Sequence, residues 1–436
     1  MLNPTIIAVT IFLIVYAFII TEKIHRAVIA MLGASAILLL GILDTKQAFY
    51  HHIDWETIVL LIGMMILVGI INTTGVFQYL AVRSAKLAKG QPIRILIMLS
   101  LLTATLSAFL DNVTTVLLIV PVTFSITNIL KVTPIPFLIA EILASNIGGT
   151  ATLIGDPPNI MIGSSVKHLT FNDFLVNLAP VIVIIMAVIF LLFYFIYRNQ
   201  LKADTALIEK LMEMNEKSYI ENPSLMKKSI VVLILTIISF MLHSVIHVSP
   251  STIAISSAAV LLLIGVKEKD IEKVFGYVEW PTIFFFAGLF ILVGALQTVG
   301  VIKFLATKAL DITGGDLTVA SILILWVSGI TSAFIDNIPY VATMIPLIKD
   351  IIIGMGLPID SIQADTLWWS LALGACLGGN GTIIGASANV VVSGIAAREG
   401  KGFSFIEFFK TGFPIMIVTL IISHLYIYFR YLIQIP

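Results

Sequence analysis

Two acidic residues lie in nearly identical apolar surroundings at distant places in the sequence. The segment SAFLDNVTTVLLIVPV (107–122) contains Asp111, and the segment SAFIDNIPYVATMIPL (332–347) contains Asp336. A carboxylate inside an apolar segment is costly and commonly marks an ion pathway or a proton relay. Two such carboxylates at matching positions indicate an ion-binding or proton-binding site, although Asp is also a good helix cap.

A second repeated motif combines glycines with amide and hydroxyl side chains. The segment GGTATLIGDPPN (148–159) aligns with GGNGTIIGASAN (378–389). Glycine and proline interrupt helices, so each segment predicts a broken helix inside the membrane. Asp156 of the first motif aligns with Ala386 of the second. This difference suggests that Asp156 either binds a cation or a proton in one half only or is a simple turn residue.

Together the two motifs give a set of candidate ion-binding and substrate-binding residues. Four of them, Asp111, Asn112, Asp336 and Asn337, are candidates for a sodium site. The full set is Asp111, Asn112, Thr114, Thr115, Thr150, Thr152, Asp156, Asn159, Asp336, Asn337, Asn380, Thr382, Ser387 and Asn389.

The surroundings of this site lead to further expectations. We expect Asp111 and Asp336 to be paired across the two halves, and no arginine near them, which favours a neutral oxyacid or a cation as cargo. Glu141 is either a proton carrier or a group that reaches the cytoplasmic surface. The thiol of Cys376 could bind trivalent arsenic, but packing among glycines is its more usual role. No nucleotide loop, metal cluster or nucleophile constellation indicates an enzyme, and we expect no cofactor.

The composition defines the environment of these residues. Of the 436 residues, 59% are hydrophobic and only 11% are charged, which predicts an all-α polytopic membrane protein in a lipid bilayer. The net charge is zero, so the composition implies no nucleic-acid partner.

The apolar segments form two sets that correspond in order. The segment from Trp55 to Ala81 aligns without a gap with that from Trp280 to Ala306. We expect an N-terminal repeat over 1–198, a linker over 199–229 and a C-terminal repeat over 230–436. Transporters are commonly built from such repeats.

Each repeat is expected to hold five transmembrane helices, one of them broken, and one re-entrant hairpin. The hairpins are expected at about 93–129 and 317–348, and the broken helices at about 134–166 and 358–396. The apolar blocks 56–85 and 281–308 are each read as one segment, and three further segments complete each repeat.

The distribution of basic residues favours inverted repeats. Five true spans per repeat reverse the orientation of the second half. With the linker in the cytoplasm, 19 of the 25 Lys and Arg residues lie on the cytoplasmic side, and both termini lie outside. The other six are Lys46, Lys167, Lys303, Lys308, Lys349 and Arg430.

The two motifs resemble the signatures of the ion transporter superfamily. The similarity is greatest to the branch that groups the melanosomal P-protein with bacterial arsenite–antimonite pumps and one class of sodium–proton antiporters. The resemblance implies a substrate site between hairpin tips and broken helices, and an elevator-like movement of that unit. It also implies a bacterial plasma-membrane location and leaves room for a homodimer.

The leading functional hypothesis is therefore a secondary transporter coupled to protons or sodium, with arsenite or antimonite efflux as its activity. A sodium–proton antiporter is the second hypothesis, and a symporter of organic or inorganic anions, such as dicarboxylates, is the third. An ion channel is the alternative from another class. Each hypothesis has a small inorganic or organic ion or oxyacid as the partner.

Overall fold

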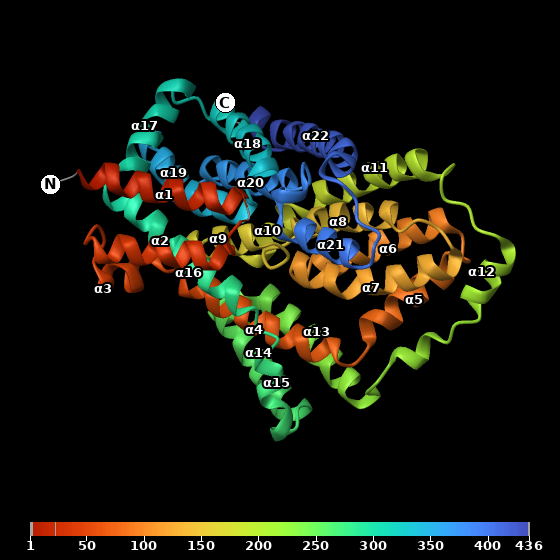
Figure 1. The fold of residues 1–436 in the computed structure, drawn as a ribbon. Coiled ribbons are helices and arrows are strands. Elements are labelled where there is room, and N and C mark those ends of the chain that lie inside the picture. Colours follow the sequence, from red (N-terminus) through yellow and green to blue (C-terminus); the bar gives the residue numbers. More distant parts are fainter. Residues whose placement is uncertain (1–2, 22, 435–436) are drawn as a thin grey trace.

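Helices form the regular structure of the chain (Figure 1). The computed structural model describes residues 3–21 and 23–434, and no strand occurs in these two ranges. Within them, nine helices are long and apolar enough to cross a membrane, and four shorter helices are also apolar. The predicted all-α polytopic membrane class is therefore confirmed.

The N-terminal half contains two helix pairs that correspond to the repeated motifs. The Asp111 motif connects α6 to α7, and the Gly-Asp-Pro-Pro motif connects α8 to α9. The helices of this half are α1 (Pro4–Thr21), α2 (Arg26–Leu39), α3 (Thr45–Gln47), α4 (Trp55–Asn72), α5 (Val76–Leu87), α6 (Pro92–Ser107), α7 (Asn112–Leu130), α8 (Ile135–Gly149), α9 (Pro157–Ser165), α10 (Phe171–Asn177) and α11 (Ala179–Tyr197).

The C-terminal half repeats this order after a linker that contains α12 (Thr205–Met212). The Asp336 motif connects α18 to α19, and the second glycine motif connects α20 to α21. The helices of this half are α13 (Pro223–Ile246), α14 (Pro250–Gly265), α15 (Ile271–Phe275), α16 (Trp280–Thr298), α17 (Val301–Thr313), α18 (Leu317–Phe334), α19 (Asn337–Gly354), α20 (Ile362–Gly378), α21 (Ser387–Arg398) and α22 (Phe405–Arg430).

Two pairs of corresponding helices, α4 with α16 and α2 with α14, pack across the boundary between the halves. Helix α4 packs on α14 of the other half, and α16 packs on α2. A Cβ atom on Gly63 would lie 2.7 Å from the backbone of Ala254, and one on Gly288 would lie 2.8 Å from the backbone of Ala30. Small residues permit such close helix crossings in membrane proteins. The aligned glycines therefore make the same crossing twice.

The apolar blocks 56–85 and 281–308 each form two helices, so the expectation of one segment per block is wrong. The breaks occur at Gly75 and Gly300, whose φ angles are +77° and +80°. This left-handed conformation ends α4 and α16, because it cannot continue a right-handed helix. Helices α5 and α17 are consequently separate and short.

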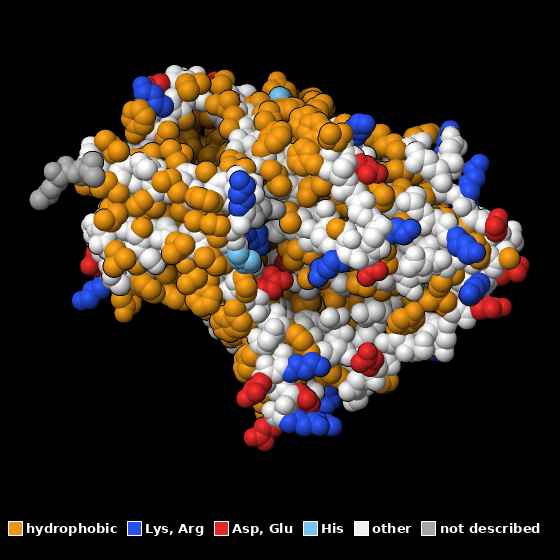
Figure 2. Space-filling model, in the orientation of Figure 1, with side chains coloured by type: hydrophobic (Ala, Val, Ile, Leu, Met, Phe, Trp, Pro, Cys, Tyr) orange, Lys and Arg blue, Asp and Glu red, His pale blue; other side chains and the backbone are white. Residues whose placement is uncertain are grey.

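The linker is attached to α5 by an ion-pair cluster. The carboxylate of Glu216 lies 3.0 Å from Nη1 of Arg83 and 2.7 Å from Nζ of Lys86. Nζ of Lys86 also donates to the carbonyl of Met214 at 2.9 Å. Figure 2 shows charged side chains gathered around α12 and α15, whereas hydrophobic side chains cover much of the remaining face. The linker therefore belongs to the polar part of the surface.

Candidate functional site

Each hairpin tip is a short turn with a carboxylate cap. Asp111 precedes α7 and accepts a hydrogen bond from the Thr114 amide at 2.9 Å. Asp336 precedes α19 and accepts one from the Ile338 amide at 3.0 Å. Both acids thus satisfy amides that a helix start leaves free. The capping role considered from the sequence is present at both tips, and any role in ion binding would add to it.

One asparagine side chain stabilises the interruption in each broken helix. Nδ2 of Asn159 donates to the carbonyls of Thr150 and Thr152 at 3.1 and 2.8 Å. Nδ2 of Asn389 donates to the carbonyls of Gly379 and Thr382 at 2.7 and 2.8 Å. These carbonyls have lost their helical partners, and in a membrane they must be satisfied within the protein. The two asparagines therefore fix the irregular backbone.

The side-chain oxygens of the same two asparagines face the other half of the molecule. Oδ1 of Asn389 accepts from Nδ2 of Asn146 at 2.9 Å, and Oδ1 of Asn159 lies 3.6 Å from the thiol of Cys376. Asn146 and Cys376 occupy equivalent positions, two residues before the paired glycines of each motif. The two contacts therefore correspond and join the halves at their centre.

Asn146 is a central residue that was not expected from the sequence. Its Nδ2 also donates to Oδ1 of Asn380 at 3.0 Å, and its Oδ1 accepts from Asn112 at 3.2 Å. The alignment of the repeats did contain an indication. Asn146 aligns with Cys376, so both repeats carry a polar side chain at this position of an otherwise apolar helix.

Asp156 lies between the two hairpin tips and is fully buried. Its Oδ1 accepts from Asn112 at 3.3 Å, and its Oδ2 accepts from Asn337 at 3.4 Å. Unlike Asp111 and Asp336, it makes no capping hydrogen bond at the start of its helix. One carboxylate thus bridges both tips, which the expected direct pairing of Asp111 with Asp336 did not anticipate.

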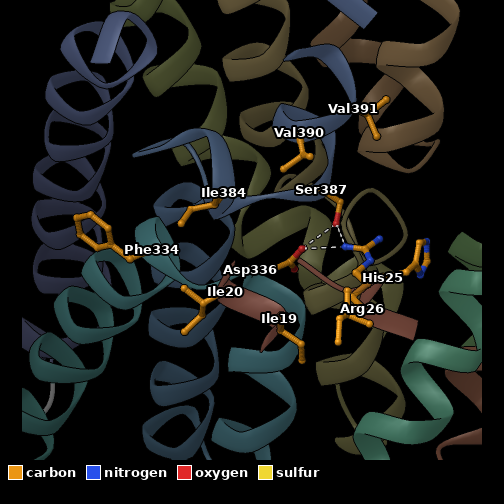
Figure 3. Close-up of a pocket in the computed structure, with 11 residues that line it drawn as sticks. Ile19, Ile20, His25, Arg26, Phe334, Asp336, Ile384, Ser387, Val390 and Val391 are labelled. Carbon is orange, nitrogen blue, oxygen red and sulfur yellow. Dashed lines mark hydrogen bonds and ion pairs between the residues drawn. The ribbon is translucent and has the colours of Figure 1, made fainter. Parts of the chain in front are cut away.

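Asp336 is paired with an arginine, so the expectation of no arginine near the site is wrong. Nη1 of Arg26 lies 3.0 Å from Oδ2 of Asp336 and also donates to Oγ of Ser387. Ser387 in turn donates to Oδ2 of Asp336 at 2.8 Å. Figure 3 shows these three side chains converging from different elements. Asp111 instead accepts from the Thr114 hydroxyl.

The position of Arg26 follows from the packing of α1 and α2. The hydroxyl of Tyr16 donates to the carbonyl of Pro339 at 2.6 Å, which holds α1 against the start of α19. The sequence places Arg26 between two apolar segments, where a loop at the membrane surface is the natural expectation. Its partner Asp336 lies 310 residues further along the chain, so no local sequence pattern predicts the contact.

Two cavities meet at Arg26. The wide cavity has a volume of about 290 Å³ and lies between the α1–α2 connection, Asp336 and α21. The inner pocket has a volume of about 20 Å³, which is room for about one water molecule. Its polar lining residues are Arg26, Asp111, Asn112, Asp156, Glu279, Thr282, Asn337 and Ser387. Glu279, at the position that aligns with Asp54, was also missed.

The remaining candidate hydroxyls mostly bind backbone. Thr152 donates to the carbonyl of Ala108, and Thr382 donates to the equivalent carbonyl of Ala333. Thr150 donates to the carbonyl of Asn146. Thr152 and Thr382 therefore tie the broken helices to the backbone of the hairpins, whereas Thr150 bonds within the end of its own helix. Thr115 is buried, and its hydroxyl has no hydrogen-bond partner among the described residues.

No cluster of three or more His, Cys, Asp or Glu side chains that suits a metal ion occurs in the described part of the chain. The carboxylates and amides around the inner pocket are nevertheless oxygen ligands of the kind that hard monovalent and divalent cations accept. The candidate sodium set is divided, because Asp336 is engaged by Arg26, whereas Asn112 and Asn337 both face Asp156.

Comparisons with known proteins agree on one family. A family model described as CitMHS, citrate transporter, matches residues 16–374. An uncharacterized transporter of Mycobacterium tuberculosis is 43% identical over 98% of this chain and 99% of its own length. The human P protein is 36% identical over 95% of this chain, which spans 58% of the P protein.

The fold has a counterpart among solved structures. The YdaH transporter of Alcanivorax borkumensis matches with a TM-score of 0.58 over 98% of this chain and 97% of its own, at 13% sequence identity. Similarity at that identity concerns the fold alone. Family, relatives and fold agree with the resemblance that the two repeated motifs indicated. The chain therefore belongs to the CitMHS citrate transporter family of the ion transporter superfamily, and it is a secondary transporter of the membrane.

Proposed function

We propose that this transporter couples the movement of a small solute to binding of a proton or sodium ion at Asp156. The observation that carries the proposal is the bridge from Asp156 to Asn112 and Asn337, one from each hairpin tip. A cation or proton on this buried carboxylate cancels its charge, which lowers the cost of moving the site through the bilayer. Binding at one carboxylate is thereby coupled to both tips.

The moving unit in this proposal consists of the hairpins α6–α7 and α18–α19 with the broken helices α8–α9 and α20–α21. Helices α2, α4, α14 and α16 form the scaffold, supported by their reciprocal close crossings. Movement of one against the other is an elevator-type form of alternating access. A homodimer formed through the scaffold would keep it fixed in the membrane.

We further propose inverted repeats in a bacterial plasma membrane, with both termini outside and the linker in the cytoplasm. The excess of basic residues on that side supports this orientation. Single cysteines at Lys210 and at Lys46, on a Cys376→Ser background, test it in intact cells. Labelling of Lys210→Cys by an impermeant thiol reagent from outside would contradict the orientation.

The cargo that the geometry supports best is a small anion. Arg26 brings a guanidinium to the wall of the inner pocket, and guanidinium groups bind carboxylates and similar oxyanions well. The family description names citrate as the cargo of the family. Arsenite or antimonite efflux is the second candidate, because the Cys376 thiol lies in the centre of the molecule beside Asn159.

Flux into proteoliposomes tests the proposal. Uptake of citrate and other carboxylates, arsenite and sodium is measured under imposed proton or sodium gradients. We expect one gradient to drive uptake, and Asp156→Asn to abolish that dependence while the protein inserts normally. Gradient-independent uptake by the parent protein would contradict coupling, and a conductance far above carrier turnover would indicate a channel.

A further inference from the structure

Arg26 and Ser387 form the boundary between the wide cavity and the inner pocket. Both residues line both spaces, whereas the other lining residues belong to one space or the other. Asp336 completes the boundary from the wide side. The three side chains are joined by Arg26–Asp336, Arg26–Ser387 and Ser387–Asp336 hydrogen bonds. A solute that passes from the wide cavity to the inner pocket must therefore separate these groups.

The charges at this boundary are unusual for the cavity that they close. The wide cavity is otherwise apolar apart from His25, with walls made by Ile19, Ile20, Ile24, Phe334, Ile384, Val390 and Val391. Asp336 supplies the acidic group of this lining, and its side chain is 12% exposed, against 28% for Arg26. A solute in the cavity thus meets one accessible guanidinium whose charge is balanced by one internal carboxylate.

The guanidinium keeps donors for a second partner. Both hydrogen bonds of Arg26 leave from Nη1, whereas a guanidinium has five N–H donors. The ring of Phe285 lies 5.1 Å from its Cζ and limits its position on another side. Arg26 can therefore donate from Nη2 to an anionic oxygen in the cavity while the contact with Asp336 is being exchanged.

We propose that Arg26 is the charge-selecting residue of the path to the inner pocket. An anionic group that enters the wide cavity replaces the Asp336 carboxylate on the guanidinium, and this exchange opens the boundary. A cationic solute would instead have to displace the guanidinium from the Asp336 carboxylate, which is the less exposed partner of the pair, at 12% against 28%. The inference rests on the proposed function only in taking the inner pocket as the transport site.

Thiol labelling measures this selection without a transported substrate. Met65 lines the inner pocket beyond the boundary, so Met65→Cys on a Cys376→Ser background places a reactive group there. Purified protein is treated with two methanethiosulfonates of similar size, one with a sulfonate and one with a trimethylammonium group. Each rate is divided by that of the same reagent with a small free thiol.

We expect the anionic reagent to label the parent protein about tenfold faster than the cationic one, a typical size for electrostatic steering. Arg26→Gln should bring the ratio close to one and raise both rates, because the boundary loses its ion pair. Arg26→Lys should keep the anion preference. Arg398→Gln, at the exposed end of α21, is the matched control and should leave the ratio unchanged.

An equal ratio in Arg26→Gln and the parent would overturn the proposal. So would failure of both proteins to react at Met65→Cys when the denatured protein does react, since the boundary would then not open. Arg26→Lys keeps the positive charge and is therefore a control for misfolding in Arg26→Gln. Folding of the variants is checked by a single elution peak. If labelling contradicts the proposal but gradient-driven flux persists, only the role of Arg26 falls.

Discussion

Asn146 of α8 donates a hydrogen bond to Asn389 of α21 across the interface between the two halves, with 2.9 Å between Nδ2 and Oδ1. Both side chains are fully buried. Asn389 simultaneously holds the break between α20 and α21 through Gly379 and Thr382. One hydrogen bond therefore connects the helix that packs on the first hairpin to the irregular backbone of the second half.

Asn146→Ala should destabilise the protein. It removes the donor to Asn389 and Asn380 and leaves buried oxygens without a partner, which costs about 1–3 kcal/mol for each unsatisfied group. We expect a lower unfolding temperature of the purified protein in detergent. Asn128→Ala, on the exposed side of α7, is the control and should be neutral. Equal unfolding temperatures for all three proteins would show that the bond contributes nothing to stability.

The sequence predicted the parts of the site that repeat. Asp111 and Asp336, and likewise Asn159 and Asn389, stand out because the same residue type returns at the same place in both halves. In the structure these pairs occupy corresponding positions, as caps of α7 and α19 and as clamps of the two breaks. Periodicity and composition were sufficient for the helical membrane class.

Asn146 and Arg26, which the sequence did not reveal, have no like residue at the corresponding place in the other half. Asn146 aligns with Cys376 in the sequence. Arg26 begins α2, whereas the corresponding helix α14 begins with Pro250. Their roles come from contacts between distant segments, which no local pattern encodes. The separation of α4 from α5 depends on the sign of one φ angle at Gly75, and hydrophobicity does not report that sign.

Gly63→Ala and Gly288→Ala should each weaken the scaffold. The added Cβ atoms would lie 2.7 and 2.8 Å from the backbones of Ala254 and Ala30, so a helix must shift rather than a side chain. Overpacking of this kind typically costs about 1–3 kcal/mol. Gly394→Ala is the matched control on α21, because a Cβ there meets open space. Thermal unfolding should rank the first two variants below the control, and the reverse order would contradict these crossings.

The linker attachment should depend on pH through Glu216. The hydrogen bond from Lys86, with further help from Arg83, lowers the pKa of Glu216 from 4.5 to about 2. Its stabilising effect is therefore fully present above the ordinary pKa and is lost as the pH falls through 4.5 towards 2. We expect amide exchange in 205–221 to increase over that range beyond the intrinsic effect of pH.

Glu216→Gln tests the assignment of this pH dependence. The variant should show faster exchange in the linker already at pH 7 and no further change on acidification to pH 3. Glu209→Gln, on the exposed part of α12, should behave like the parent. If Glu216→Gln keeps the parental response to acid, another group controls the linker.

Asp111→Asn and Asp336→Asn should differ in their effects, although the two residues are equivalent in the repeats. Both acids cap a helix, and Asn is as good a cap as Asp. Asp111 otherwise bonds the Thr114 hydroxyl, so Asp111→Asn should change the unfolding free energy by less than about 1 kcal/mol. Asp336 also carries the ion pair with Arg26, and Asp336→Asn leaves that guanidinium without its counter-charge.

We therefore expect Asp336→Asn to destabilise the protein more than Asp111→Asn does, but by less than the about 3–5 kcal/mol that follows removal of one partner from a fully buried ion pair, because the Arg26 side chain is 28% exposed. The double variant Arg26→Gln/Asp336→Asn removes both charges and should recover part of this loss, because no unpaired charge remains. Unfolding free energies of the four proteins form a double-mutant cycle that isolates the pair. Additive effects in that cycle would show that Arg26 and Asp336 do not interact, and equal losses for Asp111→Asn and Asp336→Asn would remove the asymmetry between the two tips.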